Sequence, residues 1–301
     1  MDIGLLMLGY PGRAREIARR TEDAGFSHLA LGDTQNLGPE TWGQLMLVAA
    51  ESERIRVGPG VTNTTTRDVA VTASAALALQ LESGGRAFCG IGRGDSALAK
   101  IGREPAPPAE FERDLARLRA YLAGESTPRG AAQSRIEWSR GLDLPRVPIE
   151  VAVSGPRVLE ITARQADAFL FCLGADPKTL ERARALARGG TSVFARFAGW
   201  SAGATALGDP ALAREGVAVA RSYEMDRHAE AAGRGAHALD DAHLDRFAIV
   251  GGLDAAVERF RALAAIGLDF VTIAPGSSDM DWETGWRSIE RIGRELIPWI
   301  G

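Results

Sequence analysis

The sequence holds few of the residues that mark disulfide-rich, secreted or membrane proteins. Only two cysteines are present, Cys89 and Cys172, and both lie in short apolar stretches. We therefore expect buried thiols rather than a disulfide, and a cytoplasmic location. No apolar run approaches the ~20 residues that a membrane span requires, and the first residues do not form the basic and apolar regions of a signal peptide.

The chain also lacks a basic excess, a metal-binding pattern and the motifs of common hydrolases. Its formal net charge is -4, so nucleic acid is not an expected partner. Its four histidines show no spacing with acids or cysteines that is typical of metal ligands, and we predict no metal site. There is no Gly-x-Ser-x-Gly elbow and no convincing Cys–His pair, which disfavours nucleophilic hydrolysis.

What the sequence does contain is a regular alternation of short apolar runs and amphipathic helical stretches. The expected strands are 3–8, 27–31, 55–61, 87–91, 148–153, 166–172, 191–197 and 270–273. The expected helices are 13–24, 41–52, 68–82, 109–123, 157–164, 177–188, 253–265 and 282–300. Strands that are each followed by a helix indicate a parallel sheet, and eight such units are typical of a (β/α)8 barrel.

A doubly wound open sheet is the rival fold, but its usual Gly-x-Gly-x-x-Gly after the first strand is missing. We therefore predict a single α/β domain over residues 1–301, a (β/α)8 TIM barrel. Two segments do not fit the repeating unit, and we expect them to be insertions. They cover about 124–147, after strand four, and about 199–246, after strand seven.

The stretch 86–98 is the most informative part of the sequence. Gly90, Gly92 and Gly94 stand at alternate positions, which lets a backbone lie close to a flat or phosphorylated ligand. Asp95 and Ser96 are the first polar side chains that follow. Glycine clusters by themselves usually mark turns. In a barrel, however, the loops that follow the strands form the functional face, and this loop is one of them.

Ser154 to Arg157 open a predicted helix after strand five. The free N–H groups and positive end of a helix dipole attract anions, so this segment is a candidate phosphate site. Ser154 would cap the helix and Arg157 would add a positive charge. The alternative is an ordinary helix N-terminus with proline in its first turn. The two interpretations have about equal support.

Taken together, these motifs resemble the luciferase-like flavin and deazaflavin oxidoreductases, in particular the branch similar to methylenetetrahydromethanopterin reductase. The matching segments are Gly32-Asp33, 58–63, 90–98, 153–157, 166–168 and 250–252. The resemblance implies a barrel that binds reduced FMN, or alternatively coenzyme F420, at its mouth and acts on a small organic substrate. Oxygen takes part in a monooxygenase, whereas an F420-dependent reductase transfers hydride without it. The resemblance also implies a cis peptide bond between Gly60 and Val61.

The resemblance assigns cofactor contacts to three loops. These residues are Gly60, Val61, Asn63, Gly92, Arg93, Gly94, Asp95, Ser96, Ser154, Gly155, Pro156 and Arg157, of which the last four would hold the phosphate. Asp33 and Asp95 are the catalytic candidates, although Asp95 alternatively caps the helix that follows it. Some relatives carry histidine, which acts on a substrate hydroxyl, where this chain has Thr34. We therefore do not expect alcohol oxidation by that route.

Two other functions remain open. A barrel enzyme without redox chemistry, such as a phosphosugar aldolase or isomerase, calls for a lysine at a strand end, but Lys100 and Lys178 lie elsewhere. A flavin-binding homologue without catalysis is compatible with Thr34, although not with the otherwise full set of loop motifs. The alanine-rich helices 41–52 and 68–82 either pack only against the sheet or also contact a second subunit, and the expected homodimer rests on the resemblance. The resemblance further implies a separate reductase that supplies reduced flavin or F420.

Overall fold

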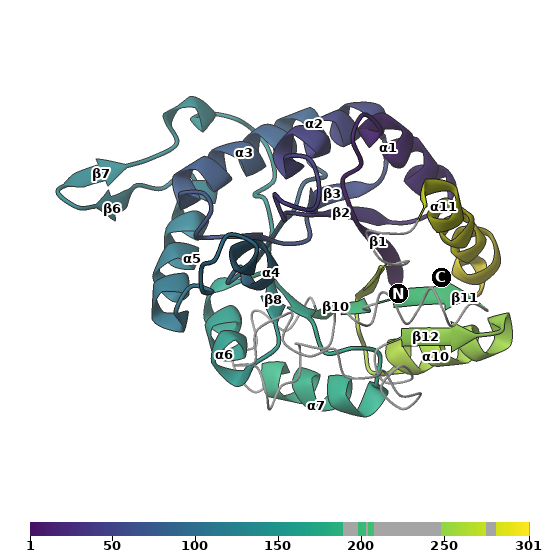
Figure 1. The fold of residues 1–301 in the computed structure, drawn as a ribbon. Helices are drawn as coiled ribbons and strands as arrows, with labels where there is room; N and C mark the ends of the chain where they lie inside the picture. The colour runs from purple at the N-terminus through teal and green to yellow at the C-terminus, as the bar shows by residue number, and fades with distance from the viewer. Residues whose placement is uncertain (189–197, 203, 208–247, 275–280, 301) are drawn as a thin grey trace.

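The computed structural model describes residues 1–188, 198–202, 204–207, 248–274 and 281–300 (Figure 1). Its centre is a parallel sheet of nine strands surrounded by helices (Figure 1). The strands are β1 (Asp2–Leu8), β2 (His28–Gly32), β3 (Arg56–Pro59), β4 (Thr62–Asn63), β5 (Cys89–Gly92), β8 (Ile149–Val153), β9 (Ala168–Phe171), β10 (Ala198–Ala202) and β13 (Phe270–Ile273). The helices are α1 (Ala14–Asp23), α2 (Thr41–Glu51), α3 (Val69–Glu82), α4 (Asp95–Ala99), α5 (Pro108–Leu122), α6 (Pro156–Gln165), α7 (Pro177–Arg188), α10 (Leu253–Ala265) and α11 (Trp282–Arg291), followed by a π turn (Ile292–Leu296) and a 3-10 turn (Ile297–Trp299).

The sheet closes on itself. Its order is β3-β2-β1-β13-β10-β9-β8-β5-β4, and a further parallel bridge joins Val57 in β3 to Ala87, just before β5. Because β3 and β4 are two parts of one strand position, the sheet has eight positions around the ring. The predicted (β/α)8 barrel is confirmed, with β1 and β13 paired where the two ends of the chain meet.

Closure between β3 and β5 depends on glycine. A Cβ atom on Gly58 would lie 2.2 Å from the carbonyl oxygen of Phe88, and one on Gly90 would lie 2.1 Å from that of Pro59. Both distances are far below van der Waals contact, so the two strands approach as closely as only glycine permits. The interpretation of Gly90 as part of a ligand-approaching loop is therefore wrong, because strand packing accounts for it.

The second half of the barrel departs from the prediction at strand seven. Residues 191–197 lie outside the described residues, and the seventh position is instead occupied by β10, which pairs with β9 and β13. Residues 199–202 therefore belong to the barrel, so no insertion begins at 199. Beyond β10, strand β11 (Ala204–Leu207) pairs with β12 (Ala248–Gly251) in a separate parallel pair. The intervening residues 208–247, which hold most of the predicted second insertion, lie outside the described residues.

Residues 124–147 connect α5 to β8. They contain an antiparallel hairpin of β6 (Thr127–Arg129) and β7 (Ala132–Ser134), which projects from the ring of helices (Figure 1). Among the described helices, none is long and apolar enough to cross a membrane. Cys89 is a buried free thiol, and Cys172 is a partly buried one.

Candidate functional site

A cavity of about 490 Å³ opens at the end of the barrel where the loops follow the strands, a size that suits a cofactor or small-molecule ligand. Ten of the predicted site residues line it: Asp33, Gly60, Val61, Asn63, Gly92, Arg93, Gly94, Asp95, Ser96 and Ser154. The fold therefore gathers residues that are up to 121 positions apart, from Asp33 to Ser154, around one space.

The predicted phosphate segment reaches the cavity only in part. Gly155, Pro156 and Arg157 are not in its lining, and the last two are exposed. The N-cap of α6 is Gly155, with no side-chain capping hydrogen bond, so the expectation that Ser154 caps this helix is wrong. The assignment of this segment to a cofactor phosphate stays a prediction.

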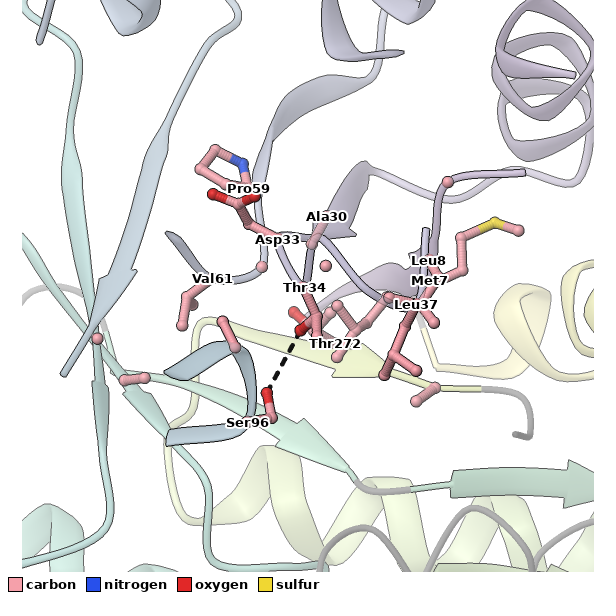
Figure 2. Close-up of a pocket in the computed structure, with 18 of the residues that line it drawn as sticks. Met7, Leu8, Ala30, Asp33, Thr34, Leu37, Pro59, Val61, Ser96 and Thr272 are labelled. Carbon is pink, nitrogen blue, oxygen red and sulfur yellow. Dashed lines mark hydrogen bonds between the residues drawn. The ribbon is translucent and has the colours of Figure 1, made fainter. Parts of the chain in front are cut away.

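A bulge between β3 and β4 forms one wall of the cavity. The peptide bond between Gly60 and Val61 is cis, as the resemblance implies. A Cβ atom on Gly60 would lie 2.6 Å from the Cβ of Ala30, so the bulge packs directly against β2. Val61 lies at this wall in Figure 2, on the same side of Thr34 as Ser96.

Asp33 is held in a buried ion pair beside this bulge. Its Oδ2 accepts a hydrogen bond of 2.7 Å from the Thr62 hydroxyl and one of 2.5 Å from Nη1 of Arg67. The Arg67 guanidinium also donates to Glu40 at 2.6 Å. Asp33 is 5% exposed. We interpret Asp33 as a positioning residue that ties the loop after β2 to the segment after β4, because its carboxylate is already bound within the protein.

Asn63 offers an unused hydrogen-bond donor at the cavity wall. Its Oδ1 accepts from the backbone N–H groups of Thr65, at 2.9 Å, and Thr66, at 2.8 Å. Since both of these partners are donors, the amide must place its oxygen toward them. The Nδ2 atom is buried and has no partner among the described residues. Buried polar atoms are nearly always paired, but this atom has almost no exposed surface, so a ligand in the cavity would reach it only after the amide shifts.

The glycine loop after β5 is pressed against Asn63. Gly94 has a φ of 95°, in the left-handed region, and a Cβ atom there would lie 3.0 Å from the Cβ of Asn63. Gly94 is the N-cap of α4, and Asp95 is the first residue of that helix. The alternative that Asp95 caps the helix is therefore wrong. Arg93 is anchored through Nε, which donates to the Ala106 carbonyl at 2.6 Å.

Two neutral hydroxyl groups meet near the centre of the mouth. The Oγ1 of Thr34 and the Oγ of Ser96 are 3.4 Å apart, and both residues line the cavity. In Figure 2, Thr34 lies between Val61 on one side and Leu8 and Leu37 on the other. A hydroxyl pair both donates and accepts hydrogen bonds, so it suits a carbonyl, imine or hydroxyl group of a ligand.

The floor of the cavity contains buried titratable groups. His28 Nε2 is 2.7 Å from the Thr272 hydroxyl, and burial, aided by the Arg56 charge, lowers the pKa of His28 to about 3. Glu150 pairs with Arg56 at 2.7 Å. Burial raises the pKa of Glu150, and the Arg56 charge partly offsets this effect. His28 is thus a neutral residue at physiological pH that contacts Thr272 from β2.

Sequence reasoning missed an aromatic and apolar side of the cavity, which includes Tyr10, Leu37, Trp282 and Trp286. Tyr10 and Leu37 lie in the loops after the first and second strands, so a listing of every residue in those loops would have included them, whereas Trp282 and Trp286 lie in helix α11. Cys172, also missed, lines the cavity, and burial raises its pKa to about 12, so it carries a neutral thiol. Within the described ranges, no three His, Cys, Asp or Glu residues form a metal-binding group.

Comparison with known proteins agrees with this geometry. The family model described as luciferase-like monooxygenase matches residues 6–269. The 5,10-methylenetetrahydromethanopterin reductase of Archaeoglobus fulgidus is 26% identical over 313 aligned residues, which cover 92% of each chain. The enzyme of the same name from Methanolobus tindarius is 30% identical over 158 residues, 51% of this chain, and the match spans about half, 48%, of that protein.

The solved structure of the coenzyme F420-dependent tetrahydromethanopterin reductase from Methanopyrus kandleri superposes with a TM-score of 0.75. Its sequence is 22% identical, and the match covers 100% of this chain and 99% of that one. This likeness shows the shared barrel. The family match covers most of the sequence, from the first strand to just before the last. The chain belongs to the luciferase-like monooxygenase family of oxidoreductases.

Proposed function

We propose that this protein is an oxidoreductase that binds a reduced flavin or deazaflavin, FMN or coenzyme F420, at the mouth of the barrel. The observation that carries the proposal is that three predicted cofactor segments surround one cavity: the Gly60–Val61 bulge, Asn63 and the glycine loop Gly92–Ser96. A planar heterocycle with carbonyl and ring-nitrogen acceptors would lie against these segments. When bound, such a cofactor supplies a hydride or an electron pair.

The chain's own residues would then hold and orient the reactants. The bulge at Gly60 and Val61 would support the ring, and Asn63 would donate to it. The segment Gly92–Ser96 would border it, with Ser154 nearer the phosphate end. The hydroxyls of Thr34 and Ser96 would bind the reacting group of the substrate, and Asp95 would hold or release a proton there. Asp33 and Arg67 would keep the bulge in place.

Among the two chemistries, we favour hydride transfer from reduced F420 to a carbon of the substrate. The support is that the relatives matching most of the chain are named as reductases, and that the Thr34–Ser96 pair is suited to polarising a C=O or C=N group. Oxygen-dependent chemistry with reduced FMN is the second candidate. Its support is that the matching family model is described as a luciferase-like monooxygenase.

The test is a thermal-shift and fluorescence titration with FMN and F420, each oxidised and reduced. Binding should stabilise the fold by ~2.7 kcal/mol at a hundredfold excess over Kd. A shift with F420 alone would support hydride transfer, to be followed by an anaerobic screen of substrates. A shift with FMN alone would support the oxygen-dependent alternative. If neither cofactor gives a shift, the proposal is wrong.

A matched pair of variants tests the role of Asn63. Asn63→Asp keeps an oxygen to accept from the Thr65 and Thr66 N–H groups but removes the Nδ2 donor, whereas Asn63→Ala removes both. We expect both variants to weaken cofactor binding by about tenfold or more. Only Asn63→Ala should also lose the turn in which the Asn63 side chain accepts from the Thr65 and Thr66 N–H groups. Asn36→Ala, in an exposed loop, is the control. Cofactor affinity unchanged in Asn63→Asp would show that Nδ2 makes no contact with the ligand.

We also propose that the protein forms a homodimer through the outer faces of α2 and α3. The support is apolar exposure: Leu47 is 39% exposed and Val71 56% exposed. Between Asp68 and Glu82, moreover, α3 carries no charged residue. Exposed apolar patches of this kind commonly mark protein interfaces. A separate reductase that supplies the reduced cofactor is the other expected partner.

A further inference from the structure

The cavity has two chemically unlike sides. One side consists of the bulge, Asn63 and the glycine loop, which the proposed function assigns to the cofactor. The opposite side is formed by the end of β1, the loop after β2 and helix α11. We call it the apolar wall, and its residues are Leu8, Tyr10, Leu37, Trp282, Trp286 and Ile289. Figure 1 shows α11 beside α1, and Figure 2 shows Leu8 and Leu37 together on the far side of Thr34 from Val61.

The aromatic part of the wall is pre-arranged. The ring centroids of Tyr10 and Trp282 are 4.8 Å apart, and those of Trp282 and Trp286 are 5.6 Å apart. The guanidinium of Arg13 stacks 4.7 Å from the centroid of Trp282, and that of Arg20 stacks 4.5 Å from the centroid of Trp286. These contacts fix the rings before any ligand arrives, so binding against them loses little side-chain freedom.

Two large apolar side chains at the outer end of the wall are exposed to solvent. Tyr10 is 42% exposed and Leu37 is 44% exposed, although both border a cavity in which they could contact a ligand. By contrast, Trp286 is 1% exposed and belongs to the core. Its indole Nε1 is buried without a partner among the described residues. Because this atom has almost no exposed surface, a ligand does not reach it. The wall therefore runs from the core to solvent and offers a ligand mainly apolar contacts.

Among the described residues on this side, the carboxylate of Asp281 already accepts a hydrogen bond from the backbone N–H of Thr284, at 3.0 Å. It is thus engaged in capping α11. The Arg13 and Arg20 guanidiniums lie against the rings and pair with Glu16 or Glu290. The two arginine charges are therefore paired with carboxylates, and the negative charge of Asp281 disfavours an anionic ligand group at this position.

We propose that the apolar wall binds an aliphatic or aromatic portion of the substrate, so that this enzyme acts on a substrate with a substantial apolar substituent. The inference rests on the proposed function only for the position of the reacting group, beside Thr34 and Ser96. The substituent would extend from there past Leu37 and Tyr10 toward solvent. Substrate selectivity would then depend on the length of the apolar substituent rather than on its charge.

The experiment measures binding of the straight-chain alcohols from n-butanol to n-decanol to the full-length protein, by quenching of tryptophan fluorescence and by calorimetry. The alcohols need no cofactor, so the result is independent of FMN or F420 binding. Each added methylene that reaches the wall should tighten binding by roughly fourfold. Affinity that does not change with chain length would overturn the inference.

Leu37→Asn and Leu142→Asn form a matched pair of variants, because Leu37 is 44% exposed at the wall and Leu142 is 41% exposed outside the cavity lining. Neither change should affect folding. Leu37→Asn should weaken decanol binding by about fourfold or more and reduce the dependence on chain length, whereas Leu142→Asn should match the wild type. Equal behaviour of the two variants would contradict the proposal. Chain-length dependence in a protein that binds neither cofactor would support the wall and refute only the proposed function.

Discussion

The ion pair between Arg67 and Asp33 allows a quantitative test of how the cofactor wall is held. The Arg67 side chain is 21% exposed and that of Asp33 is 4% exposed. Within the part of the chain that the structure describes, Arg67→Ala would therefore leave the buried carboxylate with the Thr62 hydroxyl as its one side-chain partner. Removing one member of a buried pair destabilises a protein by about 3–5 kcal/mol. Because Arg67 retains some contact with water, we expect the lower end of this range, about 3 kcal/mol.

Urea unfolding, followed by circular dichroism, measures this loss of stability. The variants can be compared if the free energy of unfolding depends on urea concentration with the same slope in each. Arg140→Ala is the control, since Arg140 and its partner Glu137 are 67% and 68% exposed, and such a pair contributes within about 1 kcal/mol. The double variant Asp33→Asn with Arg67→Ala should be more stable than Arg67→Ala alone, because no buried charge is left unpaired.

A positioning role predicts more than a loss of stability. At a temperature where both proteins are folded, Arg67→Ala should bind reduced cofactor about tenfold more weakly, because the segment after β4 is no longer tied to the loop after β2. Arg67→Lys should recover part of this affinity, since it keeps the charge but not the forked contact with both Asp33 and Glu40. The reasoning is refuted if Arg67→Ala costs no more stability than Arg140→Ala.

Three further predictions concern the floor, the glycine loop and the outer helices. The pKa of His28 is about 3 in the folded protein and about 6.5 when unfolded, so acid favours the unfolded state, and stability should fall by about 2.3 kcal/mol between about pH 6.5 and 4.5. The free energy of unfolding, measured across this pH range, should lack this contribution in His28→Asn. If it depends on pH equally in His28→Asn and the wild type, burial does not lower the pKa of His28 as described. Gly94→Ala should destabilise the fold by more than 1 kcal/mol and weaken cofactor binding, because its Cβ meets protein atoms at about 3 Å. Gly102→Ala, with similar positive φ but open space, should lose stability without losing cofactor affinity. Leu47→Glu with Val71→Glu should convert a dimer to a monomer in light scattering, and a wild-type monomer would remove the dimer proposal.

Local sequence patterns predicted the helices and strands of this fold well. The helix expected at 253–265 is α10 with the same bounds, and the helix expected at 13–24 is α1, which is followed by Gly25 with a φ of 84°. These features depend on apolar spacing and on backbone preferences within a few residues, so they can be read from a short window. The resemblance, carried by the glycine motifs and their spacing, also identified ten residues of the cavity lining.

Only the tertiary structure decided what several of those residues do. Asp33 meets Arg67, 34 residues later, and becomes a positioning residue; Gly90 meets Pro59 and closes the barrel. Tyr10 meets Trp282 from the other end of the chain, which creates an apolar wall that no local pattern indicates. The physical reason is that barrel closure brings distant strand ends to one rim. The partner of each side chain there depends on which strands are neighbours, and this information is absent from any short stretch of sequence.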